Sequence, residues 1–524
     1  MTAPAKVTYV SLSADNPEVR AGFDAAIAQI SGPGQGQLGA MHPMRIAGAP
    51  RQGTATTDSV SPADTRVVVA RVPAGAAAEV NDAVAAARAA YPRWSRIAWE
   101  ERARLVERAA EIIHQRRYEL SVWLIWEMGK NRVEALGEIE ETADLLTYYA
   151  AQMRENRGFV REMDKLAPTD RNVSVLRPYG VWAVIAPWNF PYALMGAPAA
   201  AALVAGNTVV MKPSSETPLS ALKLCAIFEE AGLPPGTINC VTGGGRTVGD
   251  TLVTHPHVDG VTFTGSFDVG FKQLYQRFST QYPKPCIVEM GGKNPAIVMD
   301  SADLDRAVQG VHRSAFGMNG HKCSACSRVY VHRAIADEFL RRLERAANET
   351  RIGDPLAPDT FDGPLATRAS YEDYQRYVGM AGKAVRAGGE VLREGAFAHG
   401  YFVRPTILTG LPADHALWRE ELFVPIVNVQ TIGSLDEALE LANATTFGLT
   451  AGLFSRKQDE IEAFQDRIEA GVIYVNRGAG ATTGAWPGVQ PFGGWKGSGS
   501  SGKNIGGHYT VQCYLREQSR TVVE

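Results

Sequence analysis

The chain has 524 residues, of which 45% are hydrophobic and 21% charged, and its formal net charge is -3. This length predicts more than one domain, and the balance of residue types is that of an ordinary globular protein. Because the positive charges are dispersed, the chain offers no broad basic field for nucleic acid. Six cysteines in so long a chain fit a reducing compartment. Residues 1–13 lack the basic start and apolar core of a signal peptide, so we expect a cytoplasmic protein.

The N-terminal part of the chain is predicted to be mainly helical. Asn16 as N-cap, with Pro17 at the first helical position, predicts a short amphipathic helix that ends near Ile30. A flexible connector is expected over residues 31–39. Helical periodicity then dominates residues 76–153.

Strand character marks two segments after this helical part and one at the end of the chain. Residues 159–163 and 172–176 are expected to form a hairpin that projects from the body. Residues 514–523 have a free edge that is suited to pairing with another subunit. We therefore expect a homodimer or a higher homo-oligomer.

The middle of the chain alternates between strand and helix patterns over residues 181–299. Strands are expected near residues 181–185, 208–211, 237–241, 260–264 and 286–289. This alternation predicts a doubly wound α/β sheet, and a second α/β unit is expected from Glu289 to about Gly507. The span between Arg177 and Lys212 is uncharged, but prolines and a glycine divide it into strand, loop, helix and strand. We therefore expect a buried βαβ unit there and no membrane segment.

The segment Asn-Gly-His-Lys-Cys-Ser-Ala-Cys-Ser-Arg contains the candidate nucleophile, Cys323. The thiolate is the reactive form of cysteine, and we expect Lys322, Arg328 and a protonated His321 to raise its fraction. Cys323 and Cys326 also form Cys-x-x-Cys, which suggests a redox pair or half of a zinc site. Because the chain has no second such pair, we rank metal binding below a nucleophilic role and predict no metal site.

Two polar side chains elsewhere are suited to oxidising an aldehyde. Asn189 lies in Pro-Trp-Asn-Phe-Pro, and its amide can donate a hydrogen bond to a developing oxyanion; the alternative is an ordinary turn asparagine. Glu289 ends an apolar strand, and a partly desolvated glutamate can activate water; the alternative is a charge facing solvent. Residues 212–218 place a cation and hydroxyls directly after the strand 208–211, where an α/β sheet binds nucleotides.

Five motifs in this order resemble those of the aldehyde dehydrogenase superfamily, over roughly residues 40–524. They are Pro-Trp-Asn-Phe-Pro at 187–191, Lys-Pro-Ser-Ser-Glu-Thr-Pro at 212–218, Phe-Thr-Gly-Ser at 263–266, Glu-Met-Gly-Gly-Lys at 289–293 and Cys323. The resemblance implies an aldehyde dehydrogenase-like α/β fold with a doubly wound Rossmann-type cofactor domain, an α/β catalytic domain and a small β oligomerisation arm. The implied boundaries are 1–155 and 177–290 for the NAD(P)-binding domain, 291–507 for the catalytic domain, and 156–176 with 508–524 for the hairpin and tail of the arm.

Two stretches are similar to the branch of the superfamily that oxidises L-glutamate γ-semialdehyde in proline catabolism. They are the cysteine loop, residues 322–328, and the anchoring loop, residues 483–494, which is similar to the loop that binds the substrate's tail. The substrate's carboxylate needs hydrogen-bond donors, and the backbone amides of Gly484 and Ala485 with the hydroxyl of Ser324 are expected to supply them. The alternative for this Gly-rich run is a flexible surface loop.

Two departures from the pattern of that branch bear on the substrate. His321 stands where glutamine is expected, and Trp486-Pro487 replaces a small aliphatic pair in the anchoring loop. A bulky indole at this place is expected to narrow or reshape the pocket for the substrate's tail. Phe190 and Phe492 are expected to form walls around the aliphatic stem of the aldehyde.

The resemblance also assigns the contacts of a nicotinamide cofactor. Ser215 occupies a position where many relatives that prefer NAD have a carboxylate, which binds the ribose and repels the 2′-phosphate of NADP. A hydroxyl does both less strongly, so we expect NAD and leave NADP open. The residues expected to contact the cofactor are Ile185, Pro187, Trp188, Lys212, Ser214, Ser215, Gly245, Phe263, Gly265, Ser266, Glu421 and Phe423.

These roles predict that an aldehyde is oxidised to a carboxylic acid through a covalent cysteine intermediate. Cys323 attacks the carbonyl carbon, Asn189 and the Cys323 backbone N–H hold the oxyanion, a hydride passes to the nicotinamide, and water activated by Glu289 hydrolyses the thioester. Three alternatives stay open. They are a dehydrogenase of another semialdehyde or aliphatic aldehyde, an enzyme that passes the thioester to coenzyme A, and a non-catalytic scaffold or thiol-based metal or redox module.

Overall fold

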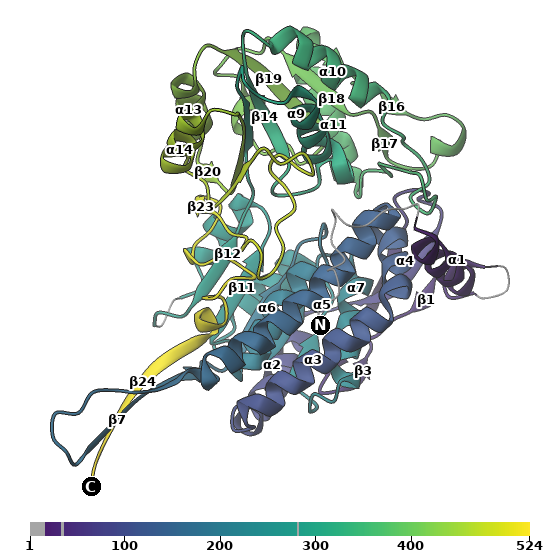
Figure 1. The fold of residues 1–524 in the computed structure, drawn as a ribbon. Helices are drawn as coiled ribbons and strands as arrows, with labels where there is room; N and C mark the ends of the chain where they lie inside the picture. The colour runs from purple at the N-terminus through teal and green to yellow at the C-terminus, as the bar shows by residue number, and fades with distance from the viewer. Residues whose placement is uncertain (1–15, 33–35, 280–281) are drawn as a thin grey trace.

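Two α/β units and a β arm make up the protein, as described by a computed structural model of residues 16–32, 36–279 and 282–524. Within these residues each unit is built on a seven-stranded sheet, and a three-stranded sheet forms the arm (Figure 1). Part of the connector expected over residues 31–39, namely 33–35, lies outside the described residues.

The first unit contains a sheet with the strand order β12-β11-β8-β9-β10-β2-β3. Its strands are β2 (Met44–Ile46), β3 (Ala49–Arg51), β8 (Val181–Ile185), β9 (Thr208–Lys212), β10 (Ile238–Cys240), β11 (Gly260–Thr264) and β12 (Cys286–Glu289). The strands from β8 to β12 are parallel. Because β9 and β10 lie on one side of β8 and β11 and β12 on the other, the strand order reverses beside β8. Doubly wound sheets bind ligands at such a reversal, so the predicted fold class is confirmed.

Strands β8, β9, β10 and β11 of this sheet are buried along their whole length. Successive residues of a strand point to opposite faces of the sheet, so both faces are buried at these strands. Val181 and Ala183 belong to a core that includes Val80 and Val84 of helix α2 (Ala77–Trp94). Trp182 belongs to the core on the other side, which includes the alanines of helix α6 (Ala193–Ala205). Burial on both faces explains why the strands are continuously apolar in the sequence.

The predicted N-terminal helices are confirmed. They are α1 (Pro17–Ser31), α2, α3 (Trp99–Gln115), α4 (Arg117–Met128) and α5 (Arg132–Glu155). The Asn16 side chain caps α1 by accepting a hydrogen bond from the N–H of Glu18 at 2.9 Å. Helices α3 and α6 both pack against α5 (Figure 1). The first unit also contains α7 (Pro218–Glu230) and α8 (Asp250–Thr254).

A small sheet near the N-terminus was not among the elements expected from the sequence. Its strands are β1 (Ala40–Met41), β5 (Val68–Ala74) and β4 (Ala55–Val60), in this order. Strand β4 is exposed along most of its length, so it lacks the apolar alternation that marks a half-buried strand.

The second unit contains a sheet with the strand order β15-β18-β19-β14-β13-β21-β22. Its strands are β13 (Asn294–Val298), β14 (Cys326–His332), β15 (Val385–Ala387), β18 (Thr406–Thr409), β19 (Ile426–Ile432), β21 (Thr450–Phe454) and β22 (Val472–Val475). Helices α9 (Leu304–Phe316) and α10 (Ala336–Asn348) share the core on one face. Helices α13 (Leu435–Asn443) and α14 (Gln458–Arg467) share the core on the other. Two further helices are α11 (Arg368–Ala381) and α12 (Ala416–Arg419), and two short ribbons pair β16 (Val391–Leu392) with β17 (Phe402–Val403) and β20 (Phe447–Gly448) with β23 (Trp495–Lys496).

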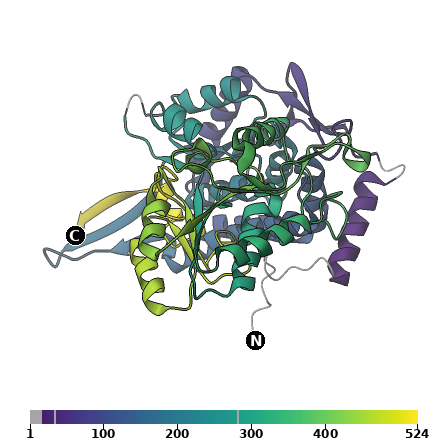
Figure 2. The same ribbon diagram turned by 90° about the horizontal axis from the view of Figure 1, so that it is seen from above.

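The arm contains the predicted hairpin and the predicted C-terminal strand. Its sheet has the order β24-β7-β6, formed by β6 (Val160–Glu162), β7 (Asp170–Pro178) and β24 (Leu515–Val523). Strand β24 pairs antiparallel with β7 along its whole length, which leaves one edge of β24 without a partner strand among the described residues. Figures 1 and 2 show the arm extending away from the body.

The uncharged span between Arg177 and Lys212 forms β8, α6 and β9, as predicted. Helix α6 is buried in the core of the first unit. In the part of the chain that the structure describes, no helix is both long enough and apolar enough to span a membrane.

Candidate active site

Cys323 lies between a tight turn, residues 317–320, and the start of β14. Met318 and Asn319 take left-handed backbone angles in this turn, with φ of 57° and 54°. The side-chain amide of Asn294, at the start of β13, donates to the carbonyl oxygens of Cys323 at 2.7 Å and of Ala325 at 2.9 Å. The cysteine loop is therefore fixed to the central strands of the second sheet.

The expectation that neighbouring cations ionise the thiol is wrong. The ammonium of Lys322 pairs with Glu134 at 2.8 Å, and the buried guanidinium of Arg328 donates to backbone carbonyls. Burial lowers the pKa of His321 to about 3, so this ring is neutral. Burial, followed by the negative charges of Glu289 and Glu421, raises the pKa of the Cys323 thiol well above its ordinary value. The cations that are close to Cys323 in sequence therefore point to other partners in the fold. The resting thiol is protonated.

Asn189 lies beside the cysteine loop, although 134 residues separate the two in sequence by numbering. Its side-chain amide, buried in the loop between β8 and α6, donates to the carbonyl oxygen of His321 at 3.0 Å. His321 precedes Cys323 by two residues, so the amide contacts the backbone just before the cysteine loop. The alternative of an isolated turn asparagine does not fit this contact.

Glu289 is buried at the carboxyl end of β12, with 6% of its surface exposed. Its Oε1 has no hydrogen-bond partner within the described residues. Burial raises the pKa of Glu289 to about 8, and its charge in turn affects the Cys323 thiol. The carboxyl group therefore does not face solvent, and its raised pKa suits a general base that works near neutral pH.

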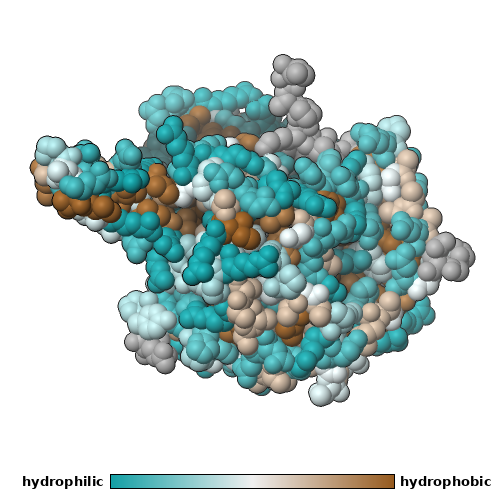
Figure 3. Space-filling view, turned by 90° about the horizontal axis from the view of Figure 1, so that it is seen from below, coloured by the Kyte–Doolittle hydropathy of each residue, from teal (hydrophilic) through white to brown (hydrophobic). Residues whose placement is uncertain are grey.

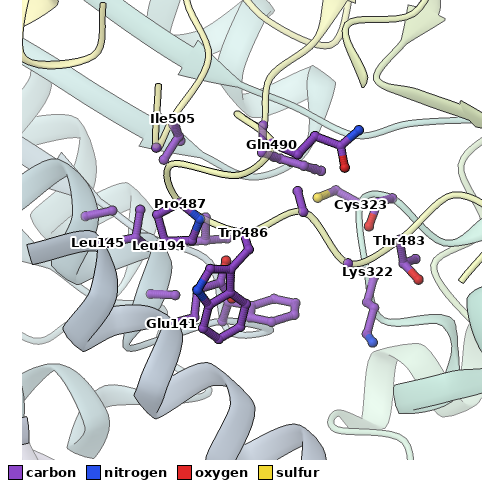
Figure 4. Close-up of a pocket in the computed structure, with 18 of the residues that line it drawn as sticks. Glu141, Leu145, Leu194, Lys322, Cys323, Thr483, Trp486, Pro487, Gln490 and Ile505 are labelled. Atoms are coloured by element: carbon purple, nitrogen blue, oxygen red, sulfur yellow. The ribbon is translucent and has the colours of Figure 1, made fainter. Parts of the chain in front are cut away.

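A pocket on one side of Cys323 brings together the residues expected to bind the substrate (Figure 4). These are Phe190, Ser324, Gly484, Ala485 and Phe492. The lining also includes charged side chains that the sequence did not single out, among them Glu134, Glu141, Arg313 and Arg477. Figure 4 shows the sulfur of Cys323 directed into the pocket, with Trp486 on the opposite side.

The anchoring loop is held in place by several hydrogen bonds, which excludes the alternative of a flexible surface loop. Arg477 donates to the carbonyl oxygens of Thr483 and, at 2.8 Å, of Gly484. The hydroxyl of Thr482, just before the loop, donates to the carbonyl of Ser324 at 2.7 Å. Trp486 is 5% exposed and lines the pocket, as expected for an indole that reshapes it.

The expected cofactor contacts gather at the carboxyl ends of β8, β9 and β11. Ile185 and Phe263 are paired neighbours at the ends of β8 and β11, where the strand order reverses. Lys212 ends β9, and burial lowers its pKa to about 8. The Ser215 hydroxyl, exposed beyond it, donates to the carbonyl of Gly243 at 3.3 Å. A Cβ added to Gly245 would meet no atom within 4 Å, so open space adjoins this backbone.

Three other expected contacts come from loops that adjoin this edge. Glu421, from the second unit, accepts a hydrogen bond from the N–H of Gly292 at 3.0 Å, and burial raises its pKa to about 7. Phe423 and Trp188 form an edge-to-face ring pair with centroids 5.4 Å apart. The remaining residues of the set occupy the same loops, namely Pro187 beside Trp188, Ser214 beside Ser215, and Gly265 and Ser266 after β11.

A model of the aldehyde dehydrogenase family matches residues 49–520. The chain belongs to this family. It is 37% identical to the 1-pyrroline-5-carboxylate dehydrogenase of Geobacillus thermodenitrificans, over 96% of each chain. It is 36% identical to 1-pyrroline-5-carboxylate dehydrogenase 2 of Bacillus subtilis, over 100% of each chain. Among solved structures, a 1-pyrroline-5-carboxylate dehydrogenase from Thermus with bound NAD is 33% identical, covers 100% of both chains and has a TM-score of 0.93.

The environment of Cys326 differs from that of Cys323 in this aldehyde dehydrogenase. Cys326 is buried in the core between β14 and helix α9, whereas Cys323 lines the pocket. All six cysteines are free thiols. This separation favours a single reactive cysteine over a redox pair.

Sequence reasoning missed Asn294, Arg477 and Thr482, which hold the two loops of the site. Asn294 gave a weak signal, since it is a polar residue at the start of an apolar strand directly after Glu-Met-Gly-Gly-Lys. Arg477 and Thr482 gave none, because each acts through a backbone carbonyl that becomes its neighbour only in the fold.

Proposed function

We propose that this aldehyde dehydrogenase oxidises L-glutamate γ-semialdehyde to L-glutamate, with NAD as hydride acceptor. The observation that carries the proposal is the single pocket that Cys323, Ser324 and the fixed anchoring loop line together. The relatives named 1-pyrroline-5-carboxylate dehydrogenase support the same substrate.

The anchoring loop is suited to a substrate with a carboxylate at its tail. The guanidinium of Arg477 donates a hydrogen bond to the carbonyl oxygen of Gly484. The N–H groups of Gly484 and Ala485 donate to no backbone carbonyl within the described part of the chain. Backbone N–H groups and a hydroxyl are good donors for a carboxylate. A decarboxylated aldehyde would leave these donors without their partner.

The cofactor proposal rests on the donors at the carboxyl end of β9. Lys212 and the hydroxyls of Ser214 and Ser215 can bind the adenosine ribose, and the open space at Gly245 can admit the pyrophosphate. Bound NAD would supply the hydride acceptor, and Phe423 would contact its nicotinamide. Ser215 places no carboxylate at the ribose, so NADP is a second candidate cofactor.

Cys323, Asn189 and Glu289 have different roles in the proposed reaction. The Cys323 thiol loses its proton to the ionised carboxylate of Glu289, which later releases it to solvent, and the sulfur bonds to the aldehyde carbon. The amide of Asn189 with the Cys323 backbone N–H stabilises the oxyanion of the thiohemiacetal. Loss of hydride leaves a thioester. Glu289, in its ionised form, removes a proton from the water that hydrolyses the thioester, which releases the acid and the thiol.

The test compares aldehydes that differ only at the tail. Purified protein is supplied with L-glutamate γ-semialdehyde or with 4-aminobutyraldehyde, which lacks the α-carboxylate, and with NAD or NADP, and formation of reduced nicotinamide is followed by absorbance. We expect kcat/KM to be higher for the semialdehyde by about tenfold or more, since it alone pairs with the donors of the anchoring loop. Equal kcat/KM for the two aldehydes would overturn the proposed substrate, and formation of an acyl-coenzyme A when coenzyme A is added would overturn hydrolysis.

We also propose that the protein is at least a homodimer that assembles through the arm. Large apolar side chains are exposed along the arm, namely Val160, Met163, Leu166, Val522 and Val523, and Figure 3 shows apolar surface along it. Strand β24 adds an open edge. Light scattering after size exclusion tests this, and a monomer at micromolar concentration would refute it.

The six free thiols support a cytoplasmic location, which cell fractionation tests.

A further inference from the structure

His321 is connected by hydrogen bonds to three separate segments of the chain. Its ring Nδ1 lies 2.8 Å from the carbonyl oxygen of Phe423, and its Nε2 lies 3.2 Å from the backbone nitrogen of Ala366. Its own carbonyl oxygen accepts the hydrogen bond from the amide of Asn189. With 1% of its surface exposed, the residue is enclosed by the parts that it connects.

The two backbone partners determine the tautomer of the ring. A carbonyl oxygen only accepts hydrogen bonds, so the proton lies on Nδ1. A backbone N–H only donates, so Nε2 is the bare nitrogen that accepts from Ala366. A second proton on the ring would point at the N–H of Ala366 and remove that bond. The geometry therefore requires a neutral ring.

The ring also contacts the aromatic side chains expected at the nicotinamide. Trp188 meets it edge to face with centroids 4.7 Å apart, and the ring of Phe423 lies at 5.8 Å. Phe423 has a φ of 56°, in the left-handed region that is unfavourable for a residue with a large side chain. The hydrogen bond from His321 to the Phe423 carbonyl stabilises this conformation.

We propose that His321 is a positioning residue, which holds the nicotinamide contacts and the oxyanion donor at fixed places relative to Cys323. Its ring fixes Phe423 and Trp188, and its carbonyl fixes Asn189. This inference rests on the proposed function, in which these neighbours contact the cofactor and the oxyanion. His321 itself transfers no proton and acts through the residues that it holds.

Two substitutions distinguish the loss of the ring's hydrogen bonds from the change in side-chain volume. His321→Leu keeps an apolar side chain without donor or acceptor, whereas the planar amide of His321→Gln carries one of each. Wild type and both variants are compared for NAD affinity by calorimetry without aldehyde, for kcat and KM, and for the rate at which a thiol reagent alkylates Cys323 at different pH values.

We expect His321→Leu to bind NAD about tenfold more weakly, the factor that corresponds to about 1.4 kcal/mol. His321→Gln should stay within about threefold of wild type, a difference smaller than one neutral hydrogen bond. The pH midpoint of alkylation should be the same in all three proteins, because the ring does not ionise the thiol.

Wild-type NAD affinity in His321→Leu, or equal weakening in both variants, would overturn the proposal. A shifted midpoint of alkylation in His321→Leu would also overturn it, since His321 would then control the charge of Cys323. If His321→Leu does not fold, His321→Asn, whose short amide cannot span both backbone partners, is expected to show the same loss of NAD affinity. Wild-type protein that binds NAD but does not oxidise glutamate semialdehyde counts against the proposed substrate alone, because the binding comparison uses no aldehyde.

Discussion

The indole N–H of Trp486 donates a hydrogen bond to the carboxylate of Asp144 across 2.8 Å, and this bond joins the anchoring loop to helix α5. The carbonyl oxygen of Trp486 also accepts from the N–H groups of Val489 and Gln490, which closes a turn within the loop. The indole thus acts both as a wall of the pocket and as a support for the loop that we propose to bind the substrate's tail.

Replacing Trp486 by phenylalanine removes this hydrogen bond and keeps an aromatic wall. We expect KM for the semialdehyde to rise about tenfold, the effect of losing one hydrogen bond to a charged acceptor, with kcat nearly unchanged. Steady-state kinetics measure this. The matched control is Trp495→Phe, because that indole is exposed and does not line the pocket. An unchanged KM in Trp486→Phe would show that the loop does not depend on the bond.

Replacing Cys323 by alanine should abolish turnover, because no other thiol lines the pocket in the described residues. NAD binding, measured by calorimetry, should be unchanged. Cys326→Ala is the matched control and should retain turnover, since its sulfur lies in the core. Loss of turnover in both variants with intact folding would favour a function of the pair.

The pH dependence of kcat should reflect Glu289. Burial raises its pKa to about 8, and the general base must be ionised, so the rate of thioester hydrolysis should rise with pH through a midpoint near 8. Glu289→Gln should lose this rise and lower kcat by roughly 10²- to 10⁴-fold. Mass spectrometry should then detect acylated Cys323. A profile with the same midpoint in Glu289→Gln would assign the ionisation to another group.

The stability of the fold should decrease between about pH 4 and pH 8 because of Asp362. Burial raises the pKa of this carboxyl to about 8, whereas it ionises near 4 in the unfolded chain. The stabilisation is therefore fully present below pH 4 and is lost as pH rises through 8. Asp362→Asn, which keeps an acceptor for the N–H of Asn319, should flatten this part of the curve of Tm against pH. Asp466→Asn, an exposed residue of α14, is the control and should leave the curve unchanged.

The parallel strands of the first sheet could be predicted because burial on both faces makes them continuously apolar, as in Val181–Ile185. The edge strands β2 and β3 of the same sheet were not predicted, and β3 is exposed. The candidate catalytic side chains could be predicted because each stands in a motif of its own. The ion pairs and pKa values around these side chains could not be predicted. The partner of Lys322 is Glu134, a residue of α5 that lies 188 positions away, and nothing in the cysteine loop reveals that the cation points toward it. The arm shows the same limit, because a hydrogen bond joins Ser174 of β7 to Glu517 of β24 although the two residues are far apart in sequence. Which edge of the arm stays open depends on this long-range pairing of strands.

The pairing of β24 with β7 has a consequence for how the molecule is made. Ser174 and Glu517 are 343 positions apart, so a ribosome must synthesise the entire second unit before the two strands can meet. Until then the nascent hairpin of β6 and β7 exposes an unpaired edge. Completion of the arm is therefore a late step in folding, and only after it would the arm be available for the proposed pairing with a second copy.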